Sequence, residues 1–254
     1  MSFDAAFFAV ALPAVFLTGL AKGGFAGIGL LALPLMSMAV PPLQAAAIML
    51  PLLMAQDVVT VWSYRREVDP FNLVTLFPGG LLGVLAGYFL ASRVSDAAVS
   101  LVLGIICVGF AGRRLLESRK PEGPVRKANF VAGTFWGALS GFTSMIAHAG
   151  GPPFQIYIMP QRLPPAVFVG TGTVFFAALN VAKVPPYIAL GQFTSATLLA
   201  AAILLPAAVL ATMFGIWLVR RIPPARFYTL IYCLLLLIGA KLVFDGIRVV
   251  IWST

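Results

Sequence analysis

Two glycine-rich segments of the chain each carry one ionisable side chain, Lys22 in the first and His148 in the second. Runs of glycine disfavour regular helix and leave backbone N–H groups available. A cationic side chain beside such donors is suited to bind an anion. The backbone positions expected to take part are Gly23, Gly24, Gly27, Gly150 and Gly151. We therefore expect both segments to contribute to a binding site for a small anion.

Each of these ionisable residues also has a purely structural alternative. Lys22 could lie at the cytoplasmic end of a membrane helix and extend its ammonium to the interface. His148, the single histidine, could be a hydrogen-bonded packing residue, or it could bind the anion and relay a proton near neutral pH. One histidine without Cys, Asp or Glu close by predicts no metal site. We expect no cofactor and no catalytic residue.

Asp57 is a carboxylate deep in an apolar run, which is a functional position by default in a membrane protein. It could carry a coupling proton or neutralise Lys22. The alternative is that Asp57 lies close enough to the membrane interface to form an ion pair with Arg65 or Arg66. Of the two candidate proton carriers we favour His148 over Asp57, because His148 lies where the substrate should bind.

Neutral polar residues could complete the anion site. Hydroxyl and amide side chains can hold an anion's oxygens, although hydroxyls on membrane helices commonly bond their own backbone. The candidates for this role are Gln155, Thr171, Thr173 and Asn180.

The amino-acid composition indicates that these residues belong to a membrane protein. The chain is 61% hydrophobic and 10% charged, with a mean hydropathy of +1.00. Soluble domains carry roughly 25% charged residues, so no water-soluble surface can be built from this sequence. The net charge of +9 comes from basic residues that flank apolar stretches, so we exclude nucleic acid as a partner. The fold class expected is an all-α polytopic membrane protein.

The chain also contains a weak internal repeat. Val40-Pro41-Pro42 returns as Leu163-Pro164-Pro165, and in that register Asp57 corresponds to Asn180. Tyr64 corresponds to Tyr187 in the same register, and after a short insertion the correspondence continues through Pro78 with Pro206, Gly87 with Gly215, Arg93 with Arg221 and Arg113 with Lys241. Repeats of apolar segments are typical of transporters. We predict a first membrane repeat over 1–112, a basic cytoplasmic linker over 113–127 and a second membrane repeat over 128–254.

Each half divides into five apolar stretches, giving about 8–10 membrane segments. The stretches are Phe3–Leu20, Gly24–Ala39, Leu43–Trp62, Phe71–Ser92 and Ala97–Leu116, then Asn129–Ala147, Pro153–Met159, Ala166–Lys183, Ser195–Val219 and Phe227–Ile247. The second stretch of each half is short and follows a glycine-rich segment. It predicts a broken or re-entrant helix that lines protein or water, where irregular backbone is tolerated. The alternative is a close helix crossing built from small residues.

Basic residues predict the orientation. The linker should be cytoplasmic, and Arg65, Arg66, Arg220 and Arg221 should lie on the same side. Arg93, Lys183 and Arg248 should lie outside. This bias favours two halves that are inverted relative to one another.

At these residues the chain resembles the sulfite exporter TauE/SafE family of membrane permeases. The resemblance rests on Gly23-Gly24, Gly27 and Gly29 followed by Pro34, on Ala149-Gly150-Gly151-Pro152-Pro153, and on Gly170-Thr171. It covers nearly the whole chain, although Lys22, Phe25 and Ala26 interrupt the first glycine run. It implies transport of small sulfur-containing anions such as sulfite or sulfonates, usually outward, in bacteria.

We therefore expect a secondary transporter of a small anion, acting as an exporter by alternating access in the bacterial inner membrane. Its partners would be the anion, a coupling proton or ion, and the lipid bilayer. An anion channel and an intramembrane enzyme are the alternatives. The sequence specifies neither the oligomeric state nor the coupling ion.

Overall fold

The computed structural model describes residues 4–25, 28–90 and 125–252, together with 101, 104–105, 107–109, 111–112 and 115–116. Every regular element among these residues is helical, which confirms the all-α prediction. The elements are α1 (Ala5–Gly23), η1 (Ile28–Leu31), α2 (Ala32–Met36), α3 (Pro42–Tyr64), α4 (Pro70–Leu90), α6 (Phe130–Ala147), α7 (Gly151–Ile158), η2 (Met159–Gln161), α8 (Pro165–Ala189), α9 (Ser195–Val219) and α10 (Pro224–Trp252).

Six of the described helices are long and apolar enough to cross a membrane: α1, α3, α4, α6, α8 and α9. The polytopic fold class is therefore confirmed. The elements after the glycine-rich segments, α2 and α7, have 5 and 8 residues. At about 1.5 Å per residue neither can cross roughly 30 Å of hydrocarbon. This agrees with the prediction of broken helices there.

The described chain packs as two compact units, and each unit draws on both halves of the sequence. Unit 1 comprises Met1–Asp69 and Ala166–Ile222, and unit 2 comprises Pro70–Pro165 and Pro223–Thr254. The predicted division at 113–127 concerns the repeat in the sequence and stays a prediction. Most of that linker lies outside the described residues.

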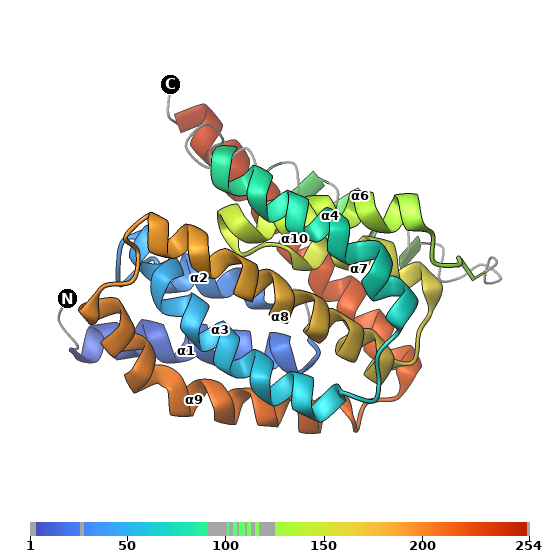
Figure 1. Cartoon of the computed structure of the whole chain (residues 1–254), viewed down its shortest axis with the longest axis horizontal. Helices are drawn as coiled ribbons and strands as arrows, with labels where there is room; N and C mark the ends of the chain where they lie inside the picture. Colours follow the sequence, from blue (N-terminus) through green and yellow to red (C-terminus); the bar gives the residue numbers. More distant parts are fainter. Residues whose placement is uncertain are drawn as a thin grey trace. The chain divides into compact units, whose positions relative to one another are not determined.

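In unit 1, α1 and α9 lie side by side at very short range (Figure 1). A Cβ atom added to Gly23 would lie 2.4 Å from the backbone carbon of Gly215, and one added to Gly19 would lie 2.4 Å from Cβ of Ala211. Small residues are what allow two membrane helices to approach this closely. Gly19 and Gly23 are therefore packing residues of α1, and the expected contribution of Gly23 to the anion site stays a prediction.

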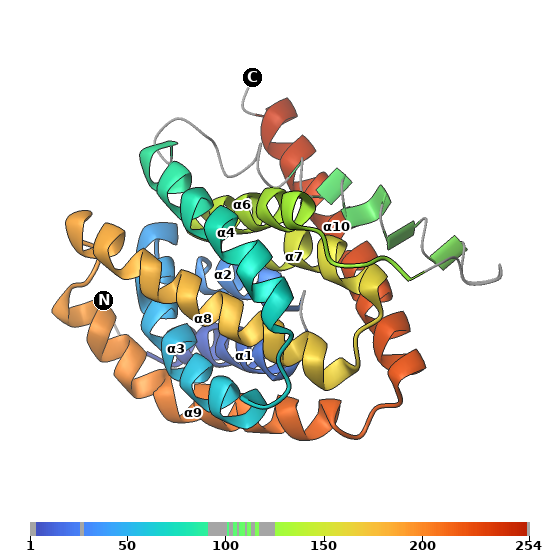
Figure 2. The same cartoon turned by 45° about the vertical axis from the view of Figure 1, so that its right-hand side comes forward.

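In unit 2, α4 and α6 lie side by side in the same way (Figure 2). A Cβ atom on Gly141 would lie 2.0 Å from the carbonyl oxygen of Gly80, and one on Gly79 would lie 1.8 Å from that of Thr134. In the repeat register, α6 corresponds to α1 and α4 corresponds to α9. Each close pair thus joins the first helix of one half to the fourth helix of the other, as a duplication with exchanged elements would require.

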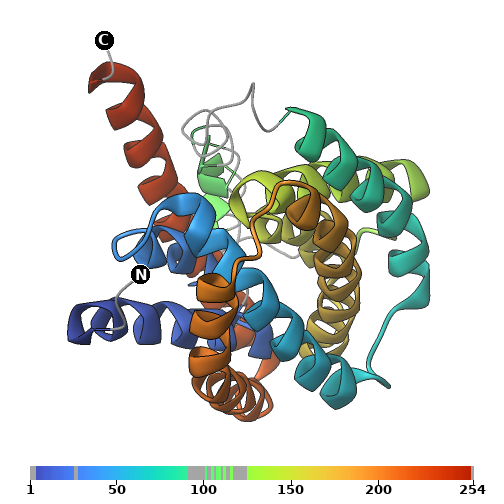
Figure 3. The same ribbon diagram turned by 60° about the vertical axis from the view of Figure 1, so that its left-hand side comes forward.

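The helices α3 and α8, which also correspond in the repeat, run in opposite directions within unit 1 (Figures 2 and 3). The loop after α3 contacts the first turns of α8, since the N–H of Asp69 donates to Oγ1 of Thr171 at 2.9 Å. Opposite directions of corresponding helices are what an inverted repeat requires. The inversion of the two complete halves stays a proposal.

One predicted boundary is wrong. The apolar stretch Ala166–Lys183 was expected to end at Lys183, before two prolines. Instead α8 continues through Pro185 and Pro186 to Ala189. Lys183 therefore lies well inside a membrane-length helix, buried to 1% exposure, and not at its outer end.

Candidate functional site

The first glycine-rich segment, whose backbone N–H groups were expected to be available to an anion, ends a helix. Gly24, at φ +139°, follows the last residue of α1, and its N–H donates to the carbonyls of Leu20 and Ala21, both at 3.2 Å. The N–H of Phe25 also donates to Leu20, at 3.1 Å. These donors cap α1 and are not available to an anion. Gly27 lies outside the described residues.

Lys22, in the last turn of α1, forms an ion pair with Asp57 of α3. The side chains of Lys22 and Asp57 are 12% and 5% exposed, so the pair is largely removed from solvent. Arg65 was the alternative partner of Asp57, but its Nη1 donates to the carbonyl of Trp62 at 2.7 Å. The structure thus shows the arrangement in which Asp57 neutralises Lys22.

Asn180 of α8 joins the same pair, because its Nδ2 donates to Oδ2 of Asp57 at 2.6 Å. The carboxylate is therefore held by an ammonium on one oxygen and by an amide on the other. One helical turn further along α8, buried Lys183 lies within electrostatic range of both Lys22 and Asp57. The network links three helices of unit 1 through charged and polar atoms inside the membrane-spanning region.

Lys183 is the residue that the sequence argument missed. The apolar stretch was taken to end at Lys183, and the orientation argument placed Lys183 outside the membrane. Two signals were present. Lys183 is three residues after Asn180, hence on the same helix face, and it is the single charge between Arg162 and Arg220.

The second glycine-rich segment joins α6 to α7 in unit 2. His148 follows the last residue of α6 in the left-handed region, at φ +50°, and the N–H of Ala149 returns to the carbonyl of Thr143 at 3.1 Å. Hydroxyls of α6 donate hydrogen bonds to the carbonyls of this segment: Ser140 Oγ donates to the carbonyl oxygen of Gly150 at 2.6 Å, and Thr143 Oγ1 donates to that of Ala149 at 3.1 Å. The peptide carbonyls are thereby held toward α6.

This segment, unlike the first, leads into a helix N-terminus. Gly150 precedes α7, and Pro152 and Pro153 occupy its first turn. Proline has no N–H, so the donors at this end come from Gly150 and Gly151. A helix N-terminus attracts negative charge through its dipole and its unbonded N–H groups.

Gln155 of α7 is buried to 0% exposure, and neither its Oε1 nor its Nε2 has a partner among the described residues. Its Nε2 lies 3.7 Å from the position that a Cβ atom on Gly151 would take, so the amide lies over the N-terminal turn of α7. A buried amide without partners costs about 1–3 kcal/mol. Such a group is expected where a ligand supplies the missing hydrogen bonds.

Other buried polar side chains of unit 2 have hydrogen-bond partners, in contrast to Gln155. The side-chain amides of Asn72 and Gln161 exchange two hydrogen bonds, at 2.8 and 3.0 Å. The hydroxyl oxygens of Tyr157 and Thr75 lie 3.2 Å apart, within hydrogen-bond distance. These groups hold α4 against η2 and α7, and Gln155 takes part in none of these bonds.

The two threonines expected at the site lie in unit 1, in the first turns of α8. Thr171 is fully buried and its Oγ1 accepts the N–H of Asp69. A Cβ on the neighbouring Gly170 would lie 1.9 Å from the carbonyl oxygen of Glu67. Packing against the α3–α4 loop accounts for Gly170 and Thr171. Thr173 is 5% exposed, and its expected role stays a prediction.

Comparisons with known proteins agree with a membrane transporter. A family model described as "Sulfite exporter TauE/SafE" matches residues 11–242. The chain is 30% identical over 59 residues to the "Probable membrane transporter protein MamO" of Paramagnetospirillum magneticum, covering 23% of this chain and 9% of that protein. It is also 30% identical over 192 residues to the "Probable sulfite/organosulfonate exporter TauE" of Cupriavidus necator, covering 68% of this chain and 66% of that protein.

This chain spans less than two thirds of the length of either relative. No solved structure matches it significantly. The family match nevertheless extends over nearly all of the described helices and over both glycine-rich segments. With its six membrane-length helices and its buried polar network, the chain belongs to the sulfite exporter TauE/SafE family of membrane proteins.

Proposed function

We propose that the protein is a secondary transporter that exports a small sulfur-containing oxyanion, such as sulfite or an organosulfonate, by alternating access. The observation that carries this proposal is the unpartnered amide of Gln155, buried over the N-terminal turn of α7. The Nε2 of Gln155 donates to one oxygen of the anion. The N–H groups of Gly150 and Gly151 donate to others, and the helix dipole adds attraction.

His148 completes this site from the end of α6. A sulfite or sulfonate group presents several acceptor oxygens around one sulfur, so it can accept bonds from an amide, from backbone and from an imidazole at the same time. A protonated His148 would attract the anion and a neutral one would release it, because an imidazole titrates near neutral pH. This change links proton movement to anion movement.

The charge network of unit 1 has a second role in the proposal. Asp57 is the carboxylate that holds Lys22 and Asn180 together, and Lys183 is close to both charges. A conformational change in a transporter is expected to break and remake contacts of this kind. Lys22 and Asn180 are thus assigned to the transport cycle, and direct contact of either with the anion is a prediction.

Replacement of Gln155 tests the anion site with two readouts of opposite sign. In Gln155→Leu the buried unpartnered amide is gone, so the melting temperature without substrate should stay the same or rise. Binding and counterflow of sulfite in proteoliposomes should fall at least tenfold, because a charge-assisted bond is worth about 1.5–3 kcal/mol. Gln44→Leu, at an exposed position of α3, is the matched control and should leave transport unchanged.

The opposite pattern would reject the site. If Gln155→Leu lowers the melting temperature and transports sulfite normally, Gln155 is a structural residue and the anion binds elsewhere. Counterflow also separates a carrier from the alternative, an anion channel, because only a carrier exchanges labelled sulfite against an opposing gradient of unlabelled sulfite.

A further inference from the structure

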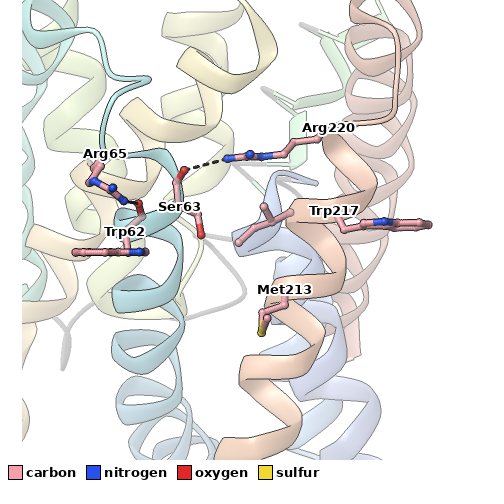
Figure 4. A pocket seen from close by; sticks show the side chains of 7 residues that line it. Trp62, Ser63, Arg65, Met213, Trp217 and Arg220 are labelled. Atoms are coloured by element: carbon pink, nitrogen blue, oxygen red, sulfur yellow. Dashed lines mark hydrogen bonds between the residues drawn. The ribbon is translucent and has the colours of Figure 1, made fainter.

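A pocket of about 320 Å³ lies where α3 and α9 end side by side in unit 1 (Figure 4). Arginine and tryptophan side chains surround it, with two apolar residues of α9 below them. The lining residues are Trp62, Ser63, Arg65, Met213, Ile216, Trp217 and Arg220. None of these residues belongs to the anion site at α7 or to the network around Asp57.

The arginines at this pocket are held in place through contacts that leave much of their charge exposed. The guanidinium of Arg65 lies 4.2 Å from the ring centre of Trp62, and that of neighbouring Arg221 lies 4.3 Å from the ring centre of Trp217. Arg220 Nη2 donates to the carbonyl of Ser63 at 3.0 Å, which joins the end of α9 to the end of α3. Each guanidinium has five N–H donors, so several remain for a ligand.

The electrostatic sum at this end of the unit is positive. Two helix C-termini converge here and would by themselves repel an anion. Arg65, Arg66, Arg220 and Arg221 outnumber the carboxylates of Glu67 and Asp69 in the adjoining loop. Among the described residues, no carboxylate forms an ion pair with Arg65, Arg220 or Arg221. The positive charges of the arginines therefore outweigh the negative partial charges at the two helix C-termini, and the electrostatic potential at this pocket is positive.

The apolar side of the pocket continues into a face that is exposed on the protein. Trp62 is 70% exposed, Met213 55% and Trp217 47%. Further along the same helices, Val58 is 72% and Leu210 67% exposed. Exposed apolar side chains on membrane-length helices face lipid tails, and tryptophans mark the level of the headgroups. The pocket is thus placed at the boundary between headgroups and hydrocarbon.

We propose that this pocket binds the phosphodiester of an anionic phospholipid, such as phosphatidylglycerol. The phosphate oxygens accept N–H bonds from Arg65 and Arg220, and the acyl chains follow the exposed apolar side chains of α3 and α9. A freely soluble anion would gain the arginines but would leave the open apolar wall uncovered. A phospholipid matches both halves of the pocket, because it carries the phosphate and the tails in one molecule.

Lipid binding to the detergent-purified full chain tests the proposal. Mixed micelles of phosphatidylglycerol should raise the melting temperature of the wild type, whereas phosphatidylcholine at the same content should not. The double variant Arg65→Gln/Arg220→Gln should bind phosphatidylglycerol about 30-fold more weakly, as expected for the loss of two basic contacts at a membrane surface. Arg248→Gln, an exposed arginine of α10, is the matched control and should bind normally.

A second readout needs no arginine variant. Phosphatidylglycerol brominated on its acyl chains should quench the fluorescence of Trp62 and Trp217 more strongly than brominated phosphatidylcholine. The difference should disappear in Trp62→Phe/Trp217→Phe. Equal quenching by both lipids would overturn the proposal. So would unchanged binding by the double arginine variant.

Two competitors distinguish the source of the anion. Inorganic phosphate and sulfite, each added at millimolar concentration and constant ionic strength, should not displace phosphatidylglycerol from the wild type. Displacement by phosphate would make the pocket a site for soluble anions. Displacement by sulfite would make it an entry point for the transported substrate. Either result contradicts a lipid site, and neither bears on the role of Gln155.

Discussion

Asn180 Nδ2 donates a hydrogen bond to Asp57 Oδ2 at 2.6 Å, and these two residues occupy the same position in the two copies of the internal repeat. They lie on α3 and α8, which run in opposite directions. The bond thus joins two positions that correspond in the predicted repeat. One of them carries an acid and the other an amide, so the bonded pair holds a single carboxylate.

That single carboxylate makes Lys22 and Asp57 interdependent. Removing one partner of a buried ion pair leaves an uncompensated charge, which costs about 3–5 kcal/mol. We expect Lys22→Met to lower the melting temperature strongly and to abolish transport. Adding Asp57→Leu to Lys22→Met should restore most of the stability and none of the transport. Thermal unfolding and counterflow of the two single variants and the double variant check this.

An additive double variant would contradict the coupling. If the two changes simply sum in stability, the ion pair contributes little. If Lys22→Met transports normally, the network has no part in the cycle. Lys22→Arg keeps the charge with a different shape and should retain part of the activity.

A glycine packed against a neighbouring helix should tolerate substitution by alanine much less well than a glycine that faces open space. In Gly141→Ala the new methyl group would lie 2.0 Å from the carbonyl oxygen of Gly80, so α4 and α6 must separate. Overpacking of this kind costs typically about 1–3 kcal/mol. Gly109→Ala is the matched control, because a Cβ there meets nothing within 4 Å and alanine favours helix by about 1 kcal/mol. Thermal unfolding in detergent should show a loss for the first variant and no loss for the second.

The sequence predicted the helices well wherever a polar residue bounds an apolar run. Ser195–Val219 was predicted to the residue, because Thr194 caps α9 at its start and Arg220 follows its end. The end of α8 was missed, because the apolar stretch was taken to stop at Lys183, whereas the helix continues through Pro185 and Pro186. Membrane helices tolerate proline because neighbouring groups satisfy the freed backbone.

The sequence identified residues of the candidate site better than it predicted how they are arranged in space. The pairing of Lys22 with Asp57 remained one of several options, because it depends on how α1 packs against α3, 35 residues apart along the chain. The first glycine run was expected to leave backbone N–H groups available, whereas the N–H of Gly24 caps α1. A glycine run can start or end a helix, and in α1 it ends one. Gln155 was predicted, but its burial without a partner becomes visible only in three dimensions.

Membrane topology gives a test of the inverted repeat that does not depend on transport. In a variant without Cys107 and Cys233, Val94→Cys and Glu122→Cys should react with an impermeant thiol reagent from opposite faces of the membrane. The basis is the asymmetry between the isolated Arg93 and the basic linker at 113–127. Labelling of both positions from the same face would exclude the inverted arrangement.

The coupling group should be visible in the pH dependence of transport. His148 ends α6 next to the donors of α7, so protonation there adds a positive charge beside the bound anion. Lower pH should therefore strengthen sulfite binding at this site, and higher pH should favour release. An inward pH gradient across proteoliposomes should therefore change the export rate.

His148→Gln keeps hydrogen-bonding capacity without the titration, so binding should survive in part while the pH response flattens. Asp57→Asn is the comparison, since it removes the other candidate proton carrier and leaves the α7 site intact. If His148→Gln keeps the full response and Asp57→Asn loses it, the proton moves through the Lys22–Asp57 network. If neither variant changes it, transport is coupled to another ion or is uncoupled.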